Sequence, residues 1–104
     1  MGQQGNPDQR RSARVPAQKP VSFSWKEVDT EQRRTTLSFA LSRFGCGLYS
    51  LRFFKPGTRL MVSYGGKTIE GAVAYCQENR PAELFEVGVG FDRDGHDFWD
   101  VEIP

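Results

Sequence analysis

The chain has little of the chemistry on which most enzymes and metal sites depend. It contains one histidine, His96, and two cysteines, Cys46 and Cys76, among 104 residues. Metal sites need several such ligands at short spacing, and these cysteines do not form a Cys-x-x-Cys pair. The sequence has no phosphate-binding loop, no histidine–nucleophile pairing and no paired-carboxylate site. We therefore expect a protein that is not an enzyme and uses no metal or cofactor, with both cysteines as small buried residues.

Long apolar segments are missing as well. No stretch approaches the roughly 20 apolar residues that a helix needs to span a bilayer. Residues 1–9 are polar and lack the apolar centre of a secretory signal. We therefore expect a cytoplasmic protein that does not insert into a membrane.

Turn-forming and aromatic residues are abundant. Eleven glycines and six prolines accompany eight phenylalanines, which favours short strands joined by tight turns. A length of 104 residues allows one domain with one core. The net charge of +1 is unevenly spread, because residues 1–20 are net positive and residues 92–104 are net negative. The two ends could attract each other, or the basic end could bind an anion.

Alternation of apolar and polar residues predicts about six strands and no amphipathic helix. The strands are expected near residues 21–25, 37–41, 46–51, 59–64, 67–77 and 85–91. Lys55–Thr58 and Gly65–Gly66 are turn signals, and Arg33 and Arg34 are expected at a solvated hairpin tip. Six such strands can close on themselves and remove exposed edges. The predicted fold is therefore all-β, a six-stranded antiparallel β-barrel of the split-barrel type.

The chain is expected to divide into four segments. Residues 1–9 are predicted as a disordered lead-in, 10–20 as a flexible arm, 21–91 as the barrel, and 92–104 as a tail that is either a short helix or an extended closing segment. The residues expected in the core are Trp25, Phe39, Val73, Phe85, Val87 and Phe91. Tyr75 is expected to share a face with Val73. Gly88 and Gly90 share another face, which indicates strong curvature or a group that covers them. Trp99 is expected to pack over a barrel opening or against the arm.

Two groups of residues carry binding chemistry. Arg10, Arg11 and Arg14 offer planar, permanently charged groups that match phosphate oxygens and the O6/N7 edge of guanine. The turn at residues 42–47 offers a hydroxyl and a backbone with few side chains, against which a flat ring can lie. Together they indicate a receptor for a guanine nucleotide. The structural alternative is a solvated arginine cluster and a simple turn of small residues.

The order of these motifs resembles the PilZ domain family. An Arg-x-x-x-Arg motif (Arg10, Arg14) is followed by Val15-Pro16, a strand, a Ser-x-x-Gly segment, the Pro56-Gly57-Thr58 turn and a Gly-Val-Gly-Phe strand ending at Phe91. The resemblance covers residues 10–91 and implies a six-stranded barrel. It also implies a bacterial receptor for the second messenger cyclic di-GMP.

The resemblance assigns roles to individual residues. It implies that Arg10 and Arg14 grip cyclic di-GMP and that Ser42 and Gly45 belong to the second motif. Arg11 and Arg43 would add positive charge. The leading Asp or Asn of that motif is Ala40 here, and its methyl group cannot accept a hydrogen bond from guanine. Losing such a bond costs about 1–3 kcal/mol.

The sequence therefore leaves several functions open. The leading one is a non-enzymatic cyclic di-GMP receptor that reports to an unknown downstream protein. The alternative is a ligand-independent PilZ-like interaction module that has lost nucleotide binding. A barrel that binds single-stranded nucleic acid would need a basic groove lined with exposed aromatics. The net charge of +1 and the acidic tail argue against that third function, so we expect no nucleic-acid partner.

Overall fold

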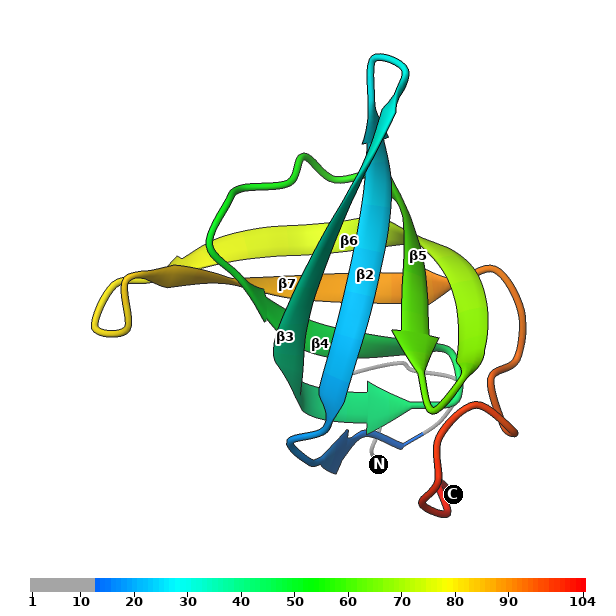
Figure 1. Cartoon of the computed structure of the whole chain (residues 1–104). Coiled ribbons are helices and arrows are strands. Elements are labelled where there is room, and N and C mark those ends of the chain that lie inside the picture. Colours follow the sequence, from blue (N-terminus) through cyan, green and yellow to red (C-terminus); the bar gives the residue numbers. More distant parts are fainter. Residues whose placement is uncertain (1–12) are drawn as a thin grey trace, which may run out of the picture.

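A computed structural model of the chain describes residues 13–104, which form an all-β barrel (Figure 1). These residues contain no helix, and their strands are β1 (Val15–Pro16), β2 (Pro20–Glu27), β3 (Thr30–Ser42), β4 (Gly45–Ser50), β5 (Arg59–Tyr64), β6 (Lys67–Asn79) and β7 (Leu84–Phe91). The strand order is β1-β3-β2-β5-β6-β7-β4, every pairing is antiparallel, and β3 also pairs with β4. That last pairing closes β2 to β7 into six strands. The predicted six-stranded antiparallel barrel is confirmed, with β1 as an extra strand.

The two strongest turn signals behave as the sequence predicts. Gly65 and Gly66 join β5 to β6 with φ angles of 59° and 81°, which side-chain-bearing residues rarely adopt. Gly57 has a φ of 95°, and the Thr58 amide donates to the Lys55 carbonyl at 3.0 Å, as in a turn with glycine at its third position. These turns set the beginning and end of β5 at the expected residues.

The first hairpin is longer than predicted. Its tip is Val28–Asp29, so Arg33 and Arg34 lie inside β3, opposite Ser24 and Phe23, and the prediction of a hairpin tip at these arginines is wrong. The charged sequence resembles a loop because this part of the hairpin extends beyond the barrel, as Figure 1 shows. A part of a strand with solvent on both faces packs against no core, so its residues need not alternate between apolar and polar.

A β-bulge in β3 reverses which residues point inward. The register of β3 against β4 shifts between Ser38 and Ala40. After the shift Leu41 is fully buried, but before it Leu37 is 45% exposed. Phe39 is absent from the buried core, and its ring lies over Gly47, where an added Cβ would come within 2.4 Å of a ring carbon. The core prediction for Phe39 is therefore wrong, and Leu37, Phe39 and Leu41 do not share one face, because a bulge adds one residue to the period of two along the strand.

A second bulge changes the face of Tyr75. The register of β6 against β7 shifts between Val73 and Tyr75. Val73 is buried, whereas the Tyr75 ring lies over Gly88, where an added Cβ would come within 2.1 Å of it. The prediction that Tyr75 shares a face with Val73 is wrong. The predicted covering group over Gly88 exists and is Tyr75, whereas no atom lies within 4 Å of the corresponding point over Gly90.

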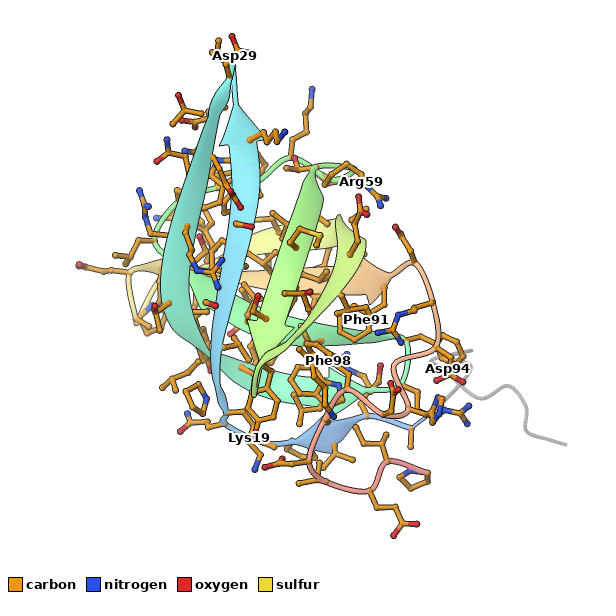
Figure 2. All side chains as sticks on the ribbon, turned by 45° about the vertical axis from the view of Figure 1, so that its right-hand side comes forward. Lys19, Asp29, Arg59, Phe91, Asp94 and Phe98 are labelled. Atoms are coloured by element: carbon orange, nitrogen blue, oxygen red, sulfur yellow. The ribbon has the colours of Figure 1, made fainter. Side chains whose placement is uncertain are left out.

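The core has an aromatic group at each end of the barrel. Phe23, Trp25 and Phe54 pack at one end, with ring centroids 4.8–5.7 Å apart: Phe23 stacks on Trp25, and Phe54 meets both rings edge-on. Phe91, Phe98 and Trp99 pack at the other (Figure 2 labels Phe91 and Phe98). The core predictions for Trp25, Val73, Val87 and Phe91 are confirmed, and Phe85 packs against the core while partly exposed.

The tail closes the second end without regular secondary structure. Residues 92–104 form bends and turns, and they place Phe98 and Trp99 in the core at 1% and 5% exposure. Core packing of Trp99, one of the two expected arrangements, is confirmed. Nowhere in residues 13–104 is there a helix of the length and apolarity needed to cross a membrane.

Candidate functional site

The structure brings together two predicted motifs that lie almost thirty residues apart in the sequence. In the pairing of β1 with β3, Val15 lies opposite Leu41 and Pro16 opposite Ala40. Continued by one residue, this register places Arg14 opposite Ser42. Part of the predicted flexible arm is thus held at the sheet, and Arg14 is half-buried there. Antiparallel pairing accounts for the juxtaposition, because it sets which residues meet across the two strands.

Ser42 organises the turn between β3 and β4. Its hydroxyl donates to the Gly45 carbonyl at 3.3 Å and accepts from the Phe44 amide at 3.2 Å. Its carbonyl accepts from Nε1 of Trp99 at 3.0 Å. The hydroxyl predicted to meet a ligand therefore already has partners within the turn. The Ser42 carbonyl connects the turn to the tail, which sequence reasoning did not find.

Gly45 has a structural reason to lack a side chain. A Cβ at this position would lie 2.2 Å from the carbonyl oxygen of Val89 in β7, far inside van der Waals contact. The space that the sequence assigned to a flat ring is occupied by the neighbouring strand. Gly45 therefore permits the close approach of β4 and β7, and contact with a ligand could only involve its backbone.

Arg43, the secondary candidate in the same turn, is bound to the tail. Its Nε lies 3.1 Å from Oδ1 of Asp94, and its Nη2 also pairs with that carboxylate. The pair raises the pKa of Arg43 and lowers the pKa of Asp94 from its ordinary value, chiefly through the hydrogen bonds between them. The Arg43 guanidinium is thus occupied as long as the tail is docked. In the sequence, the cluster of acidic residues within 92–104 was the signal that could have indicated a carboxylate partner for Arg43.

Other basic residues hold the tail beside this turn. Lys19 Nζ lies 3.2 Å from a carboxylate oxygen of Asp100. The pKa of Asp100 is lowered first by its hydrogen bond with the Tyr64 hydroxyl and then by Lys19. Figure 2 shows Lys19 and Asp94 at the same end of the barrel as Phe98. The expected attraction between a basic N-terminal segment and the acidic tail is therefore seen at Lys19 and Asp100.

Ala40 is covered by its strand neighbours. It lies opposite Pro16 in β1 and Gly47 in β4, and it is 8% exposed. The ring of Phe39 covers Gly47 beside it. A carboxylate at position 40 would consequently be largely removed from water, which is costly unless a donor meets it.

Aromatic rings on the outer face of the barrel form a surface that the sequence did not indicate. Phe39 lies over Gly47 and Tyr75 over Gly88, and these two glycines are opposite each other in β4 and β7. The ring of Tyr49 lies 5.2 Å from that of Phe39. The small-residue positions in β4 and β7 thus accommodate rings, and the half-buried aromatic residues present flat faces suited to stacking.

The remaining predicted site residues are outside the described part of the chain. Arg10 and Arg11, together with the predicted lead-in at residues 1–9, precede residue 13, where the description begins. Of the four primary candidates, Arg14, Ser42 and Gly45 can therefore be placed, and they share the end of the barrel that the tail closes.

Groups suited to metal binding or nucleophilic attack are not assembled in residues 13–104. No cluster of three or more His, Cys, Asp or Glu side chains able to hold a metal ion occurs there. Burial raises the pKa of the Cys46 thiol to about 12, so this thiol is protonated at neutral pH. His96 is exposed, with its Nδ1 3.7 Å from Asp94.

Comparison with protein families and with curated proteins returned no match. Neither a protein-family model nor a curated protein matches this chain.

Proposed function

We propose that the protein is a non-enzymatic receptor for cyclic di-GMP. The observation that carries this proposal is the register of β1 and β3, in which Val15 lies opposite Leu41, so that its continuation by one residue would bring Arg14 opposite Ser42. Arg14, the second arginine of the Arg-x-x-x-Arg motif, thus comes next to the Ser-x-x-Gly turn, from which almost thirty residues of sequence separate it. Arg10 and Arg14 would bind the phosphates or guanine edges of the ligand with paired hydrogen bonds.

The surroundings of Arg14 suit a flat, doubly charged ligand. Guanidinium groups stack on purine faces with a contribution of about 0.5–2 kcal/mol. The outer rings of Phe39 and Tyr75 offer further stacking surface near the turn. The hydrogen bond from Trp99 to the Ser42 carbonyl would carry a change in the turn to the tail, so that a binding event alters a surface available to a downstream protein.

Isothermal titration calorimetry with cyclic di-GMP tests the proposal. We expect saturable heat with the full chain and a loss of affinity of at least about tenfold in Arg14→Ala, because a charge-assisted hydrogen bond contributes about 1.5–3 kcal/mol. Arg80→Ala is the matched control, since the Arg80 side chain is 84% exposed on the distant β6–β7 hairpin and, among residues 13–104, forms an ion pair with Glu78 alone. No heat at high micromolar ligand would eliminate the receptor function.

Position 40 provides a second readout of the same site. If cyclic di-GMP meets this position as the resemblance implies, Ala40→Asp supplies the missing acceptor and tightens binding by about tenfold. Unchanged or weaker affinity, in a variant that melts as the parent does, would contradict that orientation of the ligand.

A ligand-independent interaction module is the second candidate. It is favoured by the cover over Ala40 and by two apolar side chains in the β4–β5 loop, Leu51 and Phe53, which are 86% and 52% exposed. Such side chains on a small barrel are typical of contact surfaces. A stable protein partner captured equally well with and without cyclic di-GMP, by a chain that gives no heat with the nucleotide, would favour this function.

A further inference from the structure

The outer half of β3 is an open sheet edge. Within the described part of the chain, residues 30–37 of β3 pair with β2 on one side, and the pairing of β3 with β4 begins only at Ser38. From Ser38 toward the hairpin tip, β3 and β4 diverge. The last hydrogen bond between them is the one that the Thr36 hydroxyl donates to the Tyr49 carbonyl, at 2.7 Å. Unpaired strand edges are templates for another extended segment.

The hairpin register identifies which backbone groups face this edge. Glu27 and Thr30 flank the two-residue tip and therefore form a hydrogen-bonded pair. Because such pairs alternate along an antiparallel ladder, the N–H and C=O groups of Glu31, Arg33 and Thr35 point away from β2. These three residues are available to a new strand. One of their acceptors, the Arg33 carbonyl, is bonded by the Arg34 side chain at 2.8 Å.

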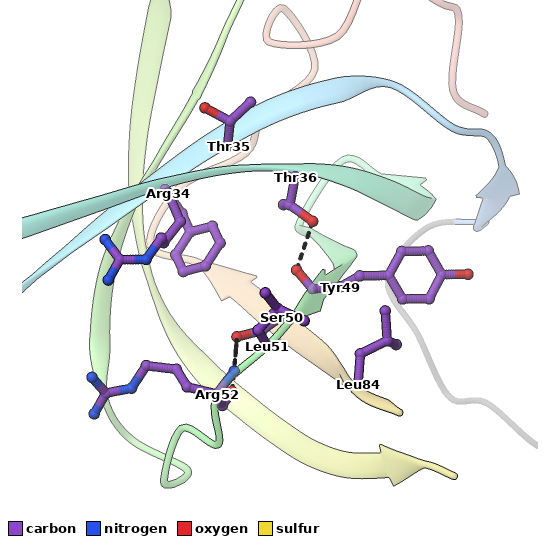
Figure 3. A pocket seen from close by; sticks show the side chains of 9 residues that line it. Arg34, Thr35, Thr36, Tyr49, Ser50, Leu51, Arg52 and Leu84 are labelled. Atoms are coloured by element: carbon purple, nitrogen blue, oxygen red, sulfur yellow. Dashed lines mark hydrogen bonds between the residues drawn. The ribbon is translucent and has the colours of Figure 1, made fainter. Parts of the chain in front are cut away.

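A pocket follows the same edge. It has a volume of about 360 Å³ and is lined by β3 residues 34–36, Tyr49–Arg52 at the end of β4, Phe23 and Leu84 (Figure 3). Leu51 is 86% exposed at its rim. Next to it, Phe53 packs edge-on against Phe85, with their centroids 5.9 Å apart. An extended segment on the β3 edge would hold alternate side chains over this apolar pocket.

Positive charge flanks the pocket. Arg34 and Arg52 lie on the Trp25 ring, at 5.4 and 5.2 Å from its centroid. Arg52 is paired with Glu27 at 2.6 Å, whereas Arg34 forms no salt bridge with any residue between 13 and 104. Figure 3 shows the Arg34 and Arg52 side chains extending toward the same side of the pocket. The rim thus has two guanidinium groups beside the single carboxylate of Glu27, whose pKa both of them lower, and the resulting excess of positive charge complements an acidic segment.

The same charges disfavour pairing with a second copy of this chain in the register centred on Arg33. An antiparallel pair of β3 edges centred on Arg33 would place Arg33 opposite its own copy, with Arg34 of each chain beside it. Like charges directly opposite each other destabilise a strand pair. Arginines at the centre of the edge therefore act against self-pairing in this register, while they favour a strand of opposite charge.

We propose that the edge of β3 from Glu31 to Thr35 is a docking site for an extended acidic segment of a partner protein. The segment adds a strand to β3, places an apolar side chain in the pocket at Leu51 and Leu84, and pairs a carboxylate with Arg34. The site lies about 30 Å from Ser42 along β3, at a rise of roughly 3.3 Å per residue. It does not depend on nucleotide binding.

Amide exchange in the presence of a model peptide tests the proposal. The probe is a seven-residue peptide with blocked ends whose alternate, pocket-facing positions carry Leu and Glu in turn, with Thr at the positions between them, and the control peptide has Lys in place of Glu. We expect the Glu peptide to slow hydrogen exchange at the amides of Glu31, Arg33 and Thr35 and to leave Gln32 and Arg34, already bonded to β2, unchanged. A merely electrostatic association would not produce this alternation.

Two pairs of variants separate strand addition from charge attraction. Thr35→Pro removes an edge donor that β2 does not use, so it should abolish peptide binding, whereas Thr35→Val retains the amide and binding. Arg34→Glu should weaken binding by at least about tenfold. Arg93→Glu, the matched charge reversal at the opposite end of the barrel, should change the affinity less than twofold. If Thr35→Pro fails to fold, the affinity of Arg34→Glu and the exchange pattern of the parent chain still test whether the peptide adds a strand to β3.

Four results would overturn the proposal. They are equal binding of the Lys peptide, undiminished binding by a folded Thr35→Pro or Arg34→Glu variant, slowed exchange that does not alternate, and concentration-dependent protection of the same amides without peptide. The last result would identify a second copy as the occupant. None of these measurements involves cyclic di-GMP, so their failure is distinct from failure of the receptor proposal.

Discussion

Val28 occupies a backbone conformation that suits glycine better than valine. It has a φ of 55°, and its side chain is 97% exposed at the tip of the β2–β3 hairpin. A β-branched residue at positive φ is strained, and a two-residue turn with positive φ at its first central position favours glycine there. Because Val28 buries almost nothing, its conformation and its contacts can be separated experimentally.

We predict that Val28→Gly stabilises the protein by about 0.5–1 kcal/mol, since relief of strain exceeds the greater entropy that glycine has in the unfolded chain. Urea denaturation measures the free energy of unfolding. Val28→Ala retains a Cβ and most of the strain, so it is the control and should gain less. A loss of stability in the glycine variant would show that the valine side chain has a stabilising contact.

Strands β4 and β7 approach each other through positions where side chains are absent. Gly45 and Gly90 lie directly opposite each other in this pair. A Cβ at Gly45 would meet the Val89 carbonyl at 2.2 Å, whereas a Cβ at Gly90 would meet nothing within 4 Å. Two glycines in one cross-strand pair thus have different roles, which only the curvature of the two strands distinguishes.

Gly45→Ala is therefore expected to destabilise the barrel by about 1–3 kcal/mol or more, because a backbone atom of β7 cannot move aside as a side chain can. Gly90→Ala is expected to change stability by less than about 0.5 kcal/mol. Thermal or urea denaturation of both variants gives the comparison. Equal destabilisation by the two substitutions would contradict this description of the β4–β7 contact.

At the scale of the whole molecule, the tail completes the barrel through both apolar and ionic contacts. Phe98 and Trp99 enter the core, Asp94 pairs with Arg43, and Asp100 contacts Tyr64 and Lys19. These contacts lower the pKa values of Asp94 and Asp100 below the ordinary value of 3.8. A carboxyl with a lowered pKa in the folded state contributes stability above its unfolded pKa and loses it as pH falls further.

We accordingly predict that the tail loosens below about pH 4 while it is fully docked at neutral pH. The NMR signal of the Trp99 indole N–H, which bonds the Ser42 carbonyl, reports the transition. Asn at both position 94 and position 100 should flatten this acid response, whereas Asp29→Asn at the hairpin tip should leave it unchanged. An identical response in the double variant would assign it to other groups.

The sequence by itself determined the fold class, the presence of six barrel strands and the sharpest turns. Alternation of apolar residues locates β2 and β7, and the glycines at positions 57, 65 and 66 mark turns whose φ angles exclude most other residues. These signals are local, because a period of two and a positive φ depend only on neighbouring residues. The order of the arginine and serine motifs could also be read from the sequence. The pairing of β1 with β3, which brings Arg14 toward Ser42, could not.

Only the tertiary structure decided which residues face inward after each bulge and which partners the candidate site has. One extra residue in β3 or β6 reverses every later position, and nothing local in the sequence announces it. The occupancy of Arg43 by Asp94, the cover over Ala40 and the open edge at Glu31–Thr35 depend on segments distant in the chain. They follow from barrel closure, which sets the strands that meet and the strand that remains partly unpaired.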